Sequence, residues 1–208
     1  MPTARKILSE TAAHARGCER CPLFRNATQT VFGQGPVPAP IMLVGEQPGD
    51  SEDKAGLPFV GPAGRILDSA MLEAGIARGP RLRHQRGQAL QERPKRRIHQ
   101  RPNRFEVEPC RWWLDQELKL VSPRIVVAMG VTAASALAGR AVTLSKEHGR
   151  ILRFGDHQQG MTTIHPSYVL RLHDEARETA FQGFVADLKR VGELVPDAVM
   201  VSERRTIP

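Results

Sequence analysis

The sequence predicts an α/β protein, a three-layer α/β/α sandwich with a mostly parallel central sheet. Short apolar runs of strand length recur along the chain, at residues 41–44, 124–129 and 161–164. Between them lie segments in which apolar residues recur with the helical period. Strands that alternate with helices are typical of a parallel sheet covered by helices on both faces.

The expected elements follow in chain order. Residues 9–20 predict a short helix, 41–44 the first central strand, and 64–74 a helix whose apolar side chains recur at helical spacing. Pro102 and Asn103 stand at the start of the longest predicted helix, 103–121. The run 124–129 predicts a buried parallel strand, which turns at 130–132 into a helix over 132–138. A hairpin-like stretch near 151–154, a strand at 161–164 and helices at 167–172 and 175–191 complete the plan.

One segment breaks this alternation. A further strand is required between the helix that ends near Ile76 and the basic segment that follows. Residues 80–93 contain no β-branched side chain, although strands favour such residues. The sequence therefore predicts something unusual at this place in the sheet.

Length and composition predict one globular domain over residues 1–208, with a loose tail over about 192–208. The chain is 40% hydrophobic and 25% charged, which is ordinary for a domain with a full core. Its longest apolar stretches fall short of the roughly 20 residues that a bilayer requires. We therefore expect no membrane span, no signal peptide and a cytoplasmic location.

The positive charge is local. The net charge is +8, and residues 78–104 contain ten Lys or Arg and one acid, so this segment carries +9 and the rest is nearly neutral. A basic stretch of this kind predicts a contact surface for a polyanion. A solvated basic loop is the alternative interpretation.

Three cysteines, Cys18, Cys21 and Cys110, suit a reduced protein better than a disulfide framework. The Cys18–Cys21 pair by itself leaves zinc, an iron–sulfur cluster, redox chemistry and no function open. A third cysteine favours a shared metal or cluster, although the usual ligand set has four members.

Reactive side chains stand in three further segments: Gly-Glu-Gln-Pro-Gly-Asp at 45–50, Lys-Arg-Arg-Ile-His at 95–99 and His-Pro-Ser at 165–167. The first and the last follow predicted strands. Loops at the carboxyl ends of parallel strands meet at one edge of the sheet, so we expect these segments to converge on one crevice.

Together with Leu-Pro-Phe-Val-Gly-Pro-Ala-Gly at 57–64, these segments resemble the UdgX-type uracil-DNA glycosylases, relatives of the iron–sulfur family-4 uracil-DNA glycosylases. The resemblance covers the chain from Cys18 to about Val191, and the 95–99 segment separates UdgX from its relatives. It implies a uracil-DNA glycosylase-like fold and a DNA-repair enzyme that flips uracil out of DNA, excises it and stays covalently bound to the abasic sugar.

The resemblance also implies residue roles. His99 would attack C1′ as the nucleophile, Glu46 would stabilise positive charge on the sugar or assist a proton transfer, and His165 would stabilise charge on uracil O2. Phe59 would stack on the flipped base and Gln47 would bind its polar edge. The remaining expected contacts are Gly45, Asp50, Ser167 and Arg171 with the substrate, and Lys95, Arg96 and Arg97 with DNA phosphates.

The cysteines match cluster positions in that family, so Cys18, Cys21 and Cys110 would hold a 4Fe-4S cluster whose fourth ligand is not identifiable in this sequence. The family's central strand, close to Tyr-Val-Thr-Asn-Ala-Val-Lys-His-Phe-Lys, carries the asparagine that reads uracil. That strand does not occur here. When the family strand is written in GC-rich codons and translated from a reading frame two bases later, it gives Arg-His-Gln-Arg-Gly-Gln-Ala-Leu-Gln. This is the amino-acid sequence of residues 83–91.

The resemblance therefore implies a frameshifted segment at 82–91, between two compensating insertions or deletions. Burying its charges in a central strand would cost several kcal/mol per ion. We expect an irregular loop here, a sheet one strand short, a uracil pocket without its asparagine, and activity that is low or absent.

Three functions remain open at this point. The first is a glycosylase that forms an adduct through His99. The second is a catalytically impaired protein that binds uracil-DNA or single-stranded DNA through residues 95–104. The third is a redox protein that uses Cys18 and Cys21, against which the absence of a thioredoxin-like βαβ pattern counts. The expected partner is uracil-containing DNA, with single strands favoured, and the expected state is a monomer.

Overall fold

The computed structural model describes residues 2–76, 81–85, 91–93, 96–98, 102–155 and 158–198; between 81 and 98, and at residue 104, it describes the backbone alone. Five strands form one sheet in the order β2-β1-β5-β7-β6. They are β1 (Ile41–Gly45), β2 (Arg81–Gln85), β5 (Ile125–Met129), β6 (Ile151–Phe154) and β7 (Gln158–Thr163). Each neighbouring pair is parallel except β6 with β7. The expected mostly parallel sheet is confirmed.

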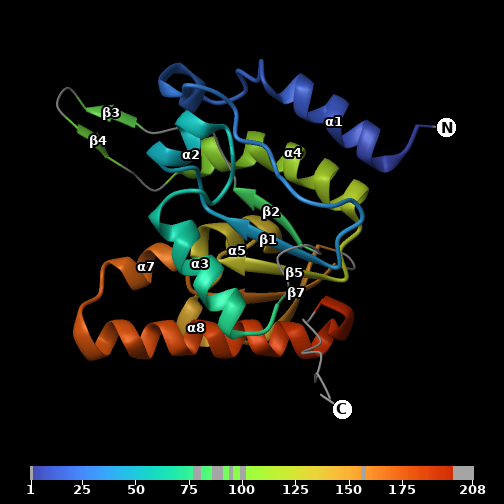
Figure 1. Ribbon diagram of the computed structural model, residues 1–208. Helices are drawn as coiled ribbons and strands as arrows, with labels where there is room; N and C mark the ends of the chain where they lie inside the picture. The colour runs from blue at the N-terminus through green and yellow to red at the C-terminus, as the bar shows by residue number, and fades with distance from the viewer. Residues whose placement is uncertain are drawn as a thin grey trace, which may run out of the picture.

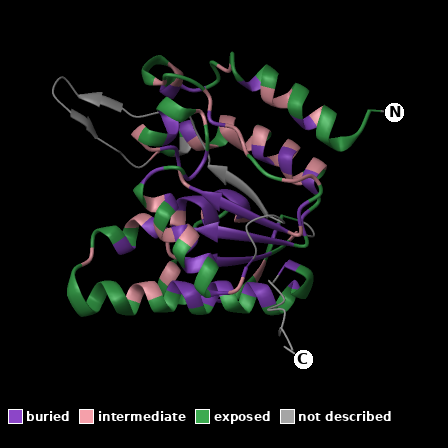
Figure 2. Ribbon diagram, viewed as in Figure 1, coloured by how far each residue is buried: buried purple, intermediate pink, exposed green. Residues whose placement is uncertain are grey.

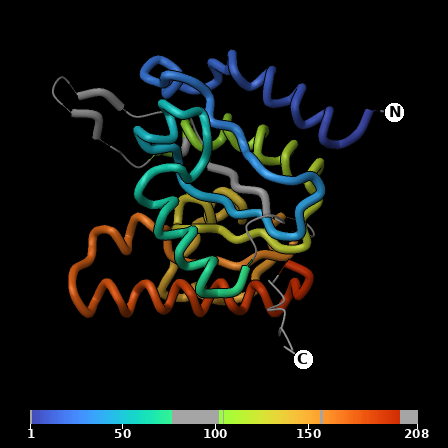
Figure 3. Tube along the Cα trace, viewed as in Figure 1, coloured from blue at the N-terminus to red at the C-terminus, as the bar shows by residue number. Residues whose placement is uncertain are grey.

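Helices cover both faces of the sheet (Figure 1). One face carries α1 (Ala4–Ala15), α4 (Arg104–Val121) and α5 (Val131–Ala138), and the other carries α3 (Pro62–Glu73) and α8 (Asp174–Leu194). In the tube of Figure 3, the blue N-terminal segment and the yellow-green α4 lie on one side of the sheet, and the orange-red α8 lies on the other. This is the expected three-layer α/β/α sandwich.

Shorter elements connect these layers. They are η1 (Pro22–Asn26), α2 (Asp50–Ala55), α6 (Leu144–Glu147), α7 (Pro166–Leu170), η2 (Pro196–Ala198) and a two-stranded antiparallel sheet of β3 (Gln91–Arg93) and β4 (Arg96–Ile98). Within the described ranges, no helix is long and apolar enough to cross a membrane.

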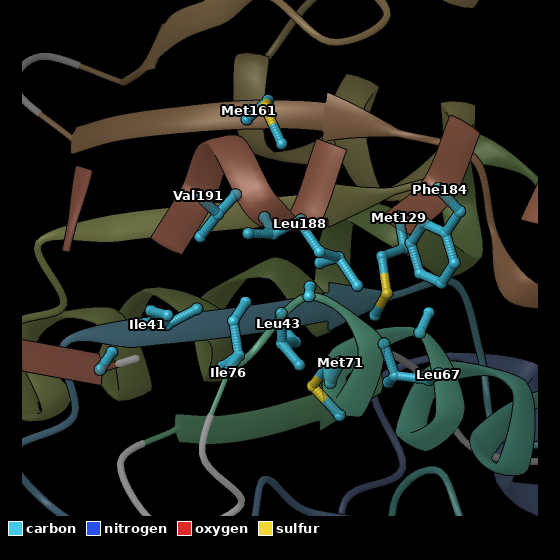
Figure 4. Packing of buried hydrophobic residues seen from close by; sticks show 14 of the residues in the cluster. Ile41, Leu43, Leu67, Met71, Ile76, Met129, Met161, Phe184, Leu188 and Val191 are labelled. Carbon is cyan, nitrogen blue, oxygen red and sulfur yellow. The ribbon is translucent and has the colours of Figure 1, made fainter. Parts of the chain in front are cut away.

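The central strands are apolar throughout because they are buried on both faces. Every residue of β1 and β5 is buried (Figure 2). Successive side chains point to opposite faces. Ile41 and Leu43 pack with α3 and α8, as Figure 4 shows, whereas Met42 and Val44 pack with α4 and α5.

The longest predicted helix begins where the sequence indicates. The Asn103 side chain accepts a hydrogen bond from the Glu106 N–H at 3.2 Å, and Glu106 Oε2 accepts one from the Asn103 N–H at 2.8 Å. This reciprocal capping box satisfies two N–H groups at the helix start. The first helix, α1, lies earlier in the chain than the predicted range 9–20. Thr3 is its N-cap residue, whose hydroxyl accepts a hydrogen bond from the Lys6 N–H, and the helix ends at Ala15.

The expectation of an irregular loop and a missing strand over residues 82–91 is wrong for residues 82–85. They belong to β2, which pairs in parallel with β1 from Ile41–Arg81 to Gly45–Gln85. The strand is also at the edge of the sheet rather than central. An edge strand needs main-chain pairing on one side only, and main-chain hydrogen bonds do not depend on β-branched side chains. Residues 86–90 lie outside the described residues. Within the expected tail over about 192–208, residues 192–194 complete α8, Pro196–Ala198 form η2, and Val195 and Ala198 are buried. The tail from residue 199 onward lies outside the described residues.

Candidate active site

A cavity of about 560 Å³ lies at the carboxyl ends of β1, β5 and β7. It brings together four of the predicted site residues, Glu46 from the loop after β1 and His165, Ser167 and Arg171 from the turn after β7 and from α7. The rest of its wall consists of Gly130, Val131, Thr132, Leu144, Ile164 and Tyr168. Ligand sites in open α/β sheets lie at this edge. A neighbouring cavity of about 600 Å³ between α7 and α8 contains none of the predicted site residues.

Hydrogen bonds orient the His165 side chain. Its Nδ1 accepts a hydrogen bond from the Ser167 N–H at 3.2 Å and lies 2.8 Å from Ser167 Oγ. Arg171 Nη1 donates to that hydroxyl oxygen at 3.2 Å, so the hydroxyl proton can point to Nδ1. Because Nδ1 accepts, a neutral imidazole carries its proton on Nε2. The turn therefore presents His165 as an Nε2–H donor.

The loop after β1 places its polar residues differently. Gly45 is the last residue of β1, Glu46 lines the cavity, and the Gln47 side chain is buried. Asp50 begins α2 and forms an ion pair with Lys54 at 2.7 Å. Gln47 and Asp50 are not among the residues that form the cavity wall.

Phe59 is buried and does not form part of the cavity wall. Its ring centroid lies 6.5 Å from that of His165, with the ring planes tilted by 32°. Its backbone φ is +56°, in the left-handed region that bulky residues rarely adopt. A residue held in such a conformation is a typical feature of ligand sites, where surrounding contacts enforce it.

The cysteines gather along the first half of α4. The Cys110 thiol on α4 forms a hydrogen bond with Cys21, which lowers the pKa of the Cys21 thiol to about 6, although burial opposes the shift. Trp113, one turn beyond Cys110, donates from Nε1 to Cys18 Sγ at 3.2 Å.

A lowered thiol pKa and neighbouring sulfurs match the donor chemistry of an iron–sulfur group, in which thiolates surround several irons. In the part of the chain that the structure describes, no set of three or more Cys, His, Asp or Glu side chains converges on a single metal ion.

The basic segment is described only in part. Arg96 begins β4, Arg97 follows it, and the strand pairs antiparallel with β3. Lys95 and His99 lie outside the described residues, so their predicted positions at the crevice stay predictions.

Sequence reasoning missed several residues of the cavity wall. Gly130, Val131 and Thr132 follow β5, and this stretch was predicted only as a turn into a helix. Its position after a central parallel strand was the available signal. Tyr168 adjoins Ser167 in α7, so its position after β7 was the same signal. Leu144 carries no such signal, because contacts between segments distant in the chain bring it to the cavity.

Comparison with known proteins identifies the family. The model of the uracil DNA glycosylase superfamily matches residues 32–189. Proteins named type-4 uracil-DNA glycosylase are similar along most of their length. The protein from Thermotoga maritima is 33% identical over 172 residues (82% of this chain, 87% of the relative). The protein from Pyrobaculum aerophilum is 36% identical over 163 residues (75% and 81%), and that from Archaeoglobus fulgidus is 30% identical over 194 residues (90% and 92%). The chain belongs to the uracil-DNA glycosylase superfamily.

Proposed function

We propose that this protein is a uracil-DNA glycosylase whose active site is the cavity between Glu46 and His165. The observation that carries the proposal is the convergence of a carboxylate and an oriented imidazole donor at the carboxyl ends of three parallel strands. The names of the relatives support the substrate class. Release of uracil from a uracil-containing oligonucleotide tests the activity, and an oligonucleotide with thymine at that position is the control.

In the proposed reaction the uracil nucleotide leaves the base stack and enters the cavity. His165 donates its Nε2–H to the uracil oxygen on which negative charge grows, while Ser167 and Arg171 keep its ring oriented. Glu46 stabilises the positive charge that develops on the sugar as the C1′–N1 bond breaks. The resemblance assigns the base-edge contact to Gln47 and the stacking contact to Phe59, both of which are buried and lie outside the cavity wall in this structure.

The finer proposal is a UdgX-type reaction. A neutral imidazole nitrogen of His99 forms a bond to C1′ as the C1′–N1 bond breaks, uracil departs with the electron pair, and the imidazole proton passes to the leaving group or to solvent. A C–N bond of this kind is not readily hydrolysed, so the DNA stays attached. The resemblance of residues 95–99 supports this proposal.

Denaturing electrophoresis after incubation with a uracil-containing single strand tests the adduct. His99→Ser is expected to release uracil and leave an abasic strand without an adduct, since water replaces the imidazole. An undiminished adduct in His99→Ser would falsify the role of His99. Salt dependence of binding to the same strand tests the phosphate contacts proposed for Lys95, Arg96 and Arg97.

We further propose that Cys18, Cys21 and Cys110 hold a 4Fe-4S cluster, which would tie the N-terminal segment to α4. The lowered pKa of Cys21 and its contact with Cys110 support thiolate ligation there. A brown protein with broad visible absorbance and bound iron is the expected result. Colourless protein without iron, after anaerobic purification or reconstitution, contradicts the proposal.

The origin of residues 82–91 decides between an active enzyme and the alternative, an impaired protein that binds uracil-DNA without chemistry. We propose that this segment is frameshifted and lacks the uracil-reading asparagine. The amino-acid sequence of residues 83–91 supports this proposal, because it equals the family strand translated in a shifted reading frame. Replacing 82–91 by the family-like strand is expected to raise uracil release and adduct yield together. Equal rates for the two forms would show that the written segment is functionally adequate.

A further inference from the structure

Glu52 is buried beside the cavity loops, and none of the proposed roles uses it. Its side chain on α2 is 5% exposed. Its two carboxylate oxygens accept hydrogen bonds from two different loops: Oε2 from the Gly49 N–H at 3.0 Å, and Oε1 from the Gly61 N–H at 2.7 Å. Gly49 is the N-cap residue of α2 and Gly61 that of α3, so one carboxylate holds the starts of both helices together.

The contacts of Glu52 with both loops depend on there being no side chain at Gly49 or Gly61. A Cβ atom at Gly49 would approach Glu52 Oε2 to 2.8 Å, and one at Gly61 would approach Oε1 to 2.9 Å. These separations are shorter than van der Waals contact. The two glycines and the carboxylate therefore form one tightly packed unit.

The two loops that Glu52 joins carry residues proposed to bind uracil. Gln47 lies two residues before Gly49, and Phe59 lies two residues before Gly61. Phe59 has a left-handed backbone, and its ring packs against His165. A displacement of either loop would thus move a base contact and the aromatic neighbour of His165.

We infer that Glu52 is a positioning residue for uracil excision, which sets the spacing of the loops carrying Gln47 and Phe59. The inference rests on the proposed function for the reaction that it serves. A carboxylate can accept from both N–H groups at once, with charge-assisted bonds. Glutamine has the same size but one acceptor oxygen, and its NH₂ group would face one of the two N–H donors.

Glu52→Gln is therefore the informative variant, and Asp53→Asn is its matched control. Asp53 is the next residue of α2 and is also buried. Its carboxylate oxygens accept from the Thr28 N–H at 2.9 and 3.2 Å, which ties α2 to the segment after η1. Both variants remove one charge from a buried carboxylate that accepts main-chain hydrogen bonds. Asp53→Asn therefore shows how much stability and activity this change costs at a carboxylate that does not join the two loops.

Single-turnover uracil release, binding of a uracil-free single strand and hydrogen exchange at Gly49 and Gly61 are measured for both variants. For Glu52→Gln we expect uracil release to slow by about 100-fold, as misplacement of reacting groups by about 1 Å can produce. Binding of the uracil-free strand is expected to stay within about two-fold, and amide exchange at Gly49 and Gly61 to accelerate. Asp53→Asn is expected to keep uracil release within about three-fold of the parent.

Equal loss of activity in the two folded variants, or unchanged exchange at Gly49 and Gly61 in Glu52→Gln, overturns the positioning role. A parent protein that releases no uracil overturns the proposed function instead. In that case amide exchange at the two glycines still decides whether Glu52 holds the loops.

Discussion

At the scale of single residues, Gly64 shows the tightest packing around the candidate site. A Cβ atom there would lie 1.9 Å from the carbonyl oxygen of Phe59, which is backbone and cannot rotate away. Gly64→Ala is therefore expected to lower the free energy of unfolding by at least about 1–3 kcal/mol, the usual cost of overpacking. Urea unfolding measures this change.

Gly183 is the matched control for that substitution. It lies within α8, and a Cβ atom there would meet nothing within 4 Å. Gly183→Ala should raise stability by about 0.5–1 kcal/mol, because glycine is unfavourable inside a helix. If Gly64→Ala were as stable as the parent, the close approach to Phe59 would be disproved.

Ser167 connects Arg171 to His165 and is the second informative residue. Ser167→Ala removes the hydroxyl that lies 2.8 Å from His165 Nδ1 and 3.2 Å from Arg171 Nη1. Loss of one such bond, worth about 1–1.5 kcal/mol, should slow uracil release by about ten-fold. Single-turnover kinetics measure the rate. Ser167→Thr keeps the hydroxyl and serves as the control. If it slows uracil release as much as Ser167→Ala does, loss of the hydrogen bond is not the cause.

At the scale of elements, the capping box at Asn103 determines where α4 begins. Asn103→Ala removes the acceptor for the Glu106 N–H and should reduce stability by about 1 kcal/mol. Because α4 carries Cys110, we expect faster hydrogen exchange in its first turns. Asn103→Asp keeps an acceptor in place and should retain most of the stability. Identical melting of Asn103→Ala and the parent would exclude a capping contribution.

The short helix α6 supplies Leu144 to the cavity wall and is held to the end of α5 by an ion pair. Arg140 Nη1 and Nη2 donate to Glu147 Oε1 and Oε2, both at 2.8 Å. The hydrogen bond from Arg140 lowers the pKa of Glu147 below its ordinary value of 4.5. The pair therefore stabilises the fold above pH 4.5 and loses this effect as the pH falls through the lowered pKa.

Arg140→Gln should accordingly be less stable than the parent at neutral pH, with a difference that shrinks in acid. Urea unfolding at a series of pH values measures it. Since the Arg140 side chain is exposed, the effect is expected to be small and to weaken in high salt. A difference that grows as the pH falls would contradict this assignment.

At the scale of the whole molecule, one sheet separates two apolar clusters that share its strands. Leu67 and Phe184 belong to one cluster, and Leu114 and Leu137 to the other. Because alternating residues of the same strands enter both, we expect one cooperative unfolding transition. Both tryptophans of the sequence, Trp112 and Trp113, lie on α4, so their fluorescence reports on this helix, whose Leu114 packs in the second cluster.

Leu67→Ala tests this coupling from the opposite face. It should lower stability by about 2–5 kcal/mol and shift tryptophan fluorescence and circular dichroism by the same denaturant concentration. Phe105→Ala is a suitable control, because that side chain is 81% exposed. A shift in circular dichroism alone would show that the two faces unfold separately.

The sequence alone was sufficient to predict the central strands β1 and β5, because strands buried on both faces are apolar at every position. It also determined the start of α4, which local capping at Asn103 specifies. Glu46, His165 and Ser167 of the cavity wall lie in segments that follow predicted strands, whereas Arg171 was expected there only from the family resemblance. Each of these features depends on neighbours close in the chain or on a simple period.

The remaining features depend on contacts between distant segments of the chain, which no local sequence pattern specifies. The edge position of β2 results from its pairing with β1, about forty residues earlier in the chain. No side-chain pattern in residues 81–85 predicts this pairing. Phe59 is buried against His165, more than one hundred residues later, although its predicted role suggested an open stacking surface. The hydrogen bond from the Gly61 N–H to Glu52 also depends on the fold. Almost every residue has a main-chain N–H, so the sequence does not indicate which acceptor a particular N–H will meet.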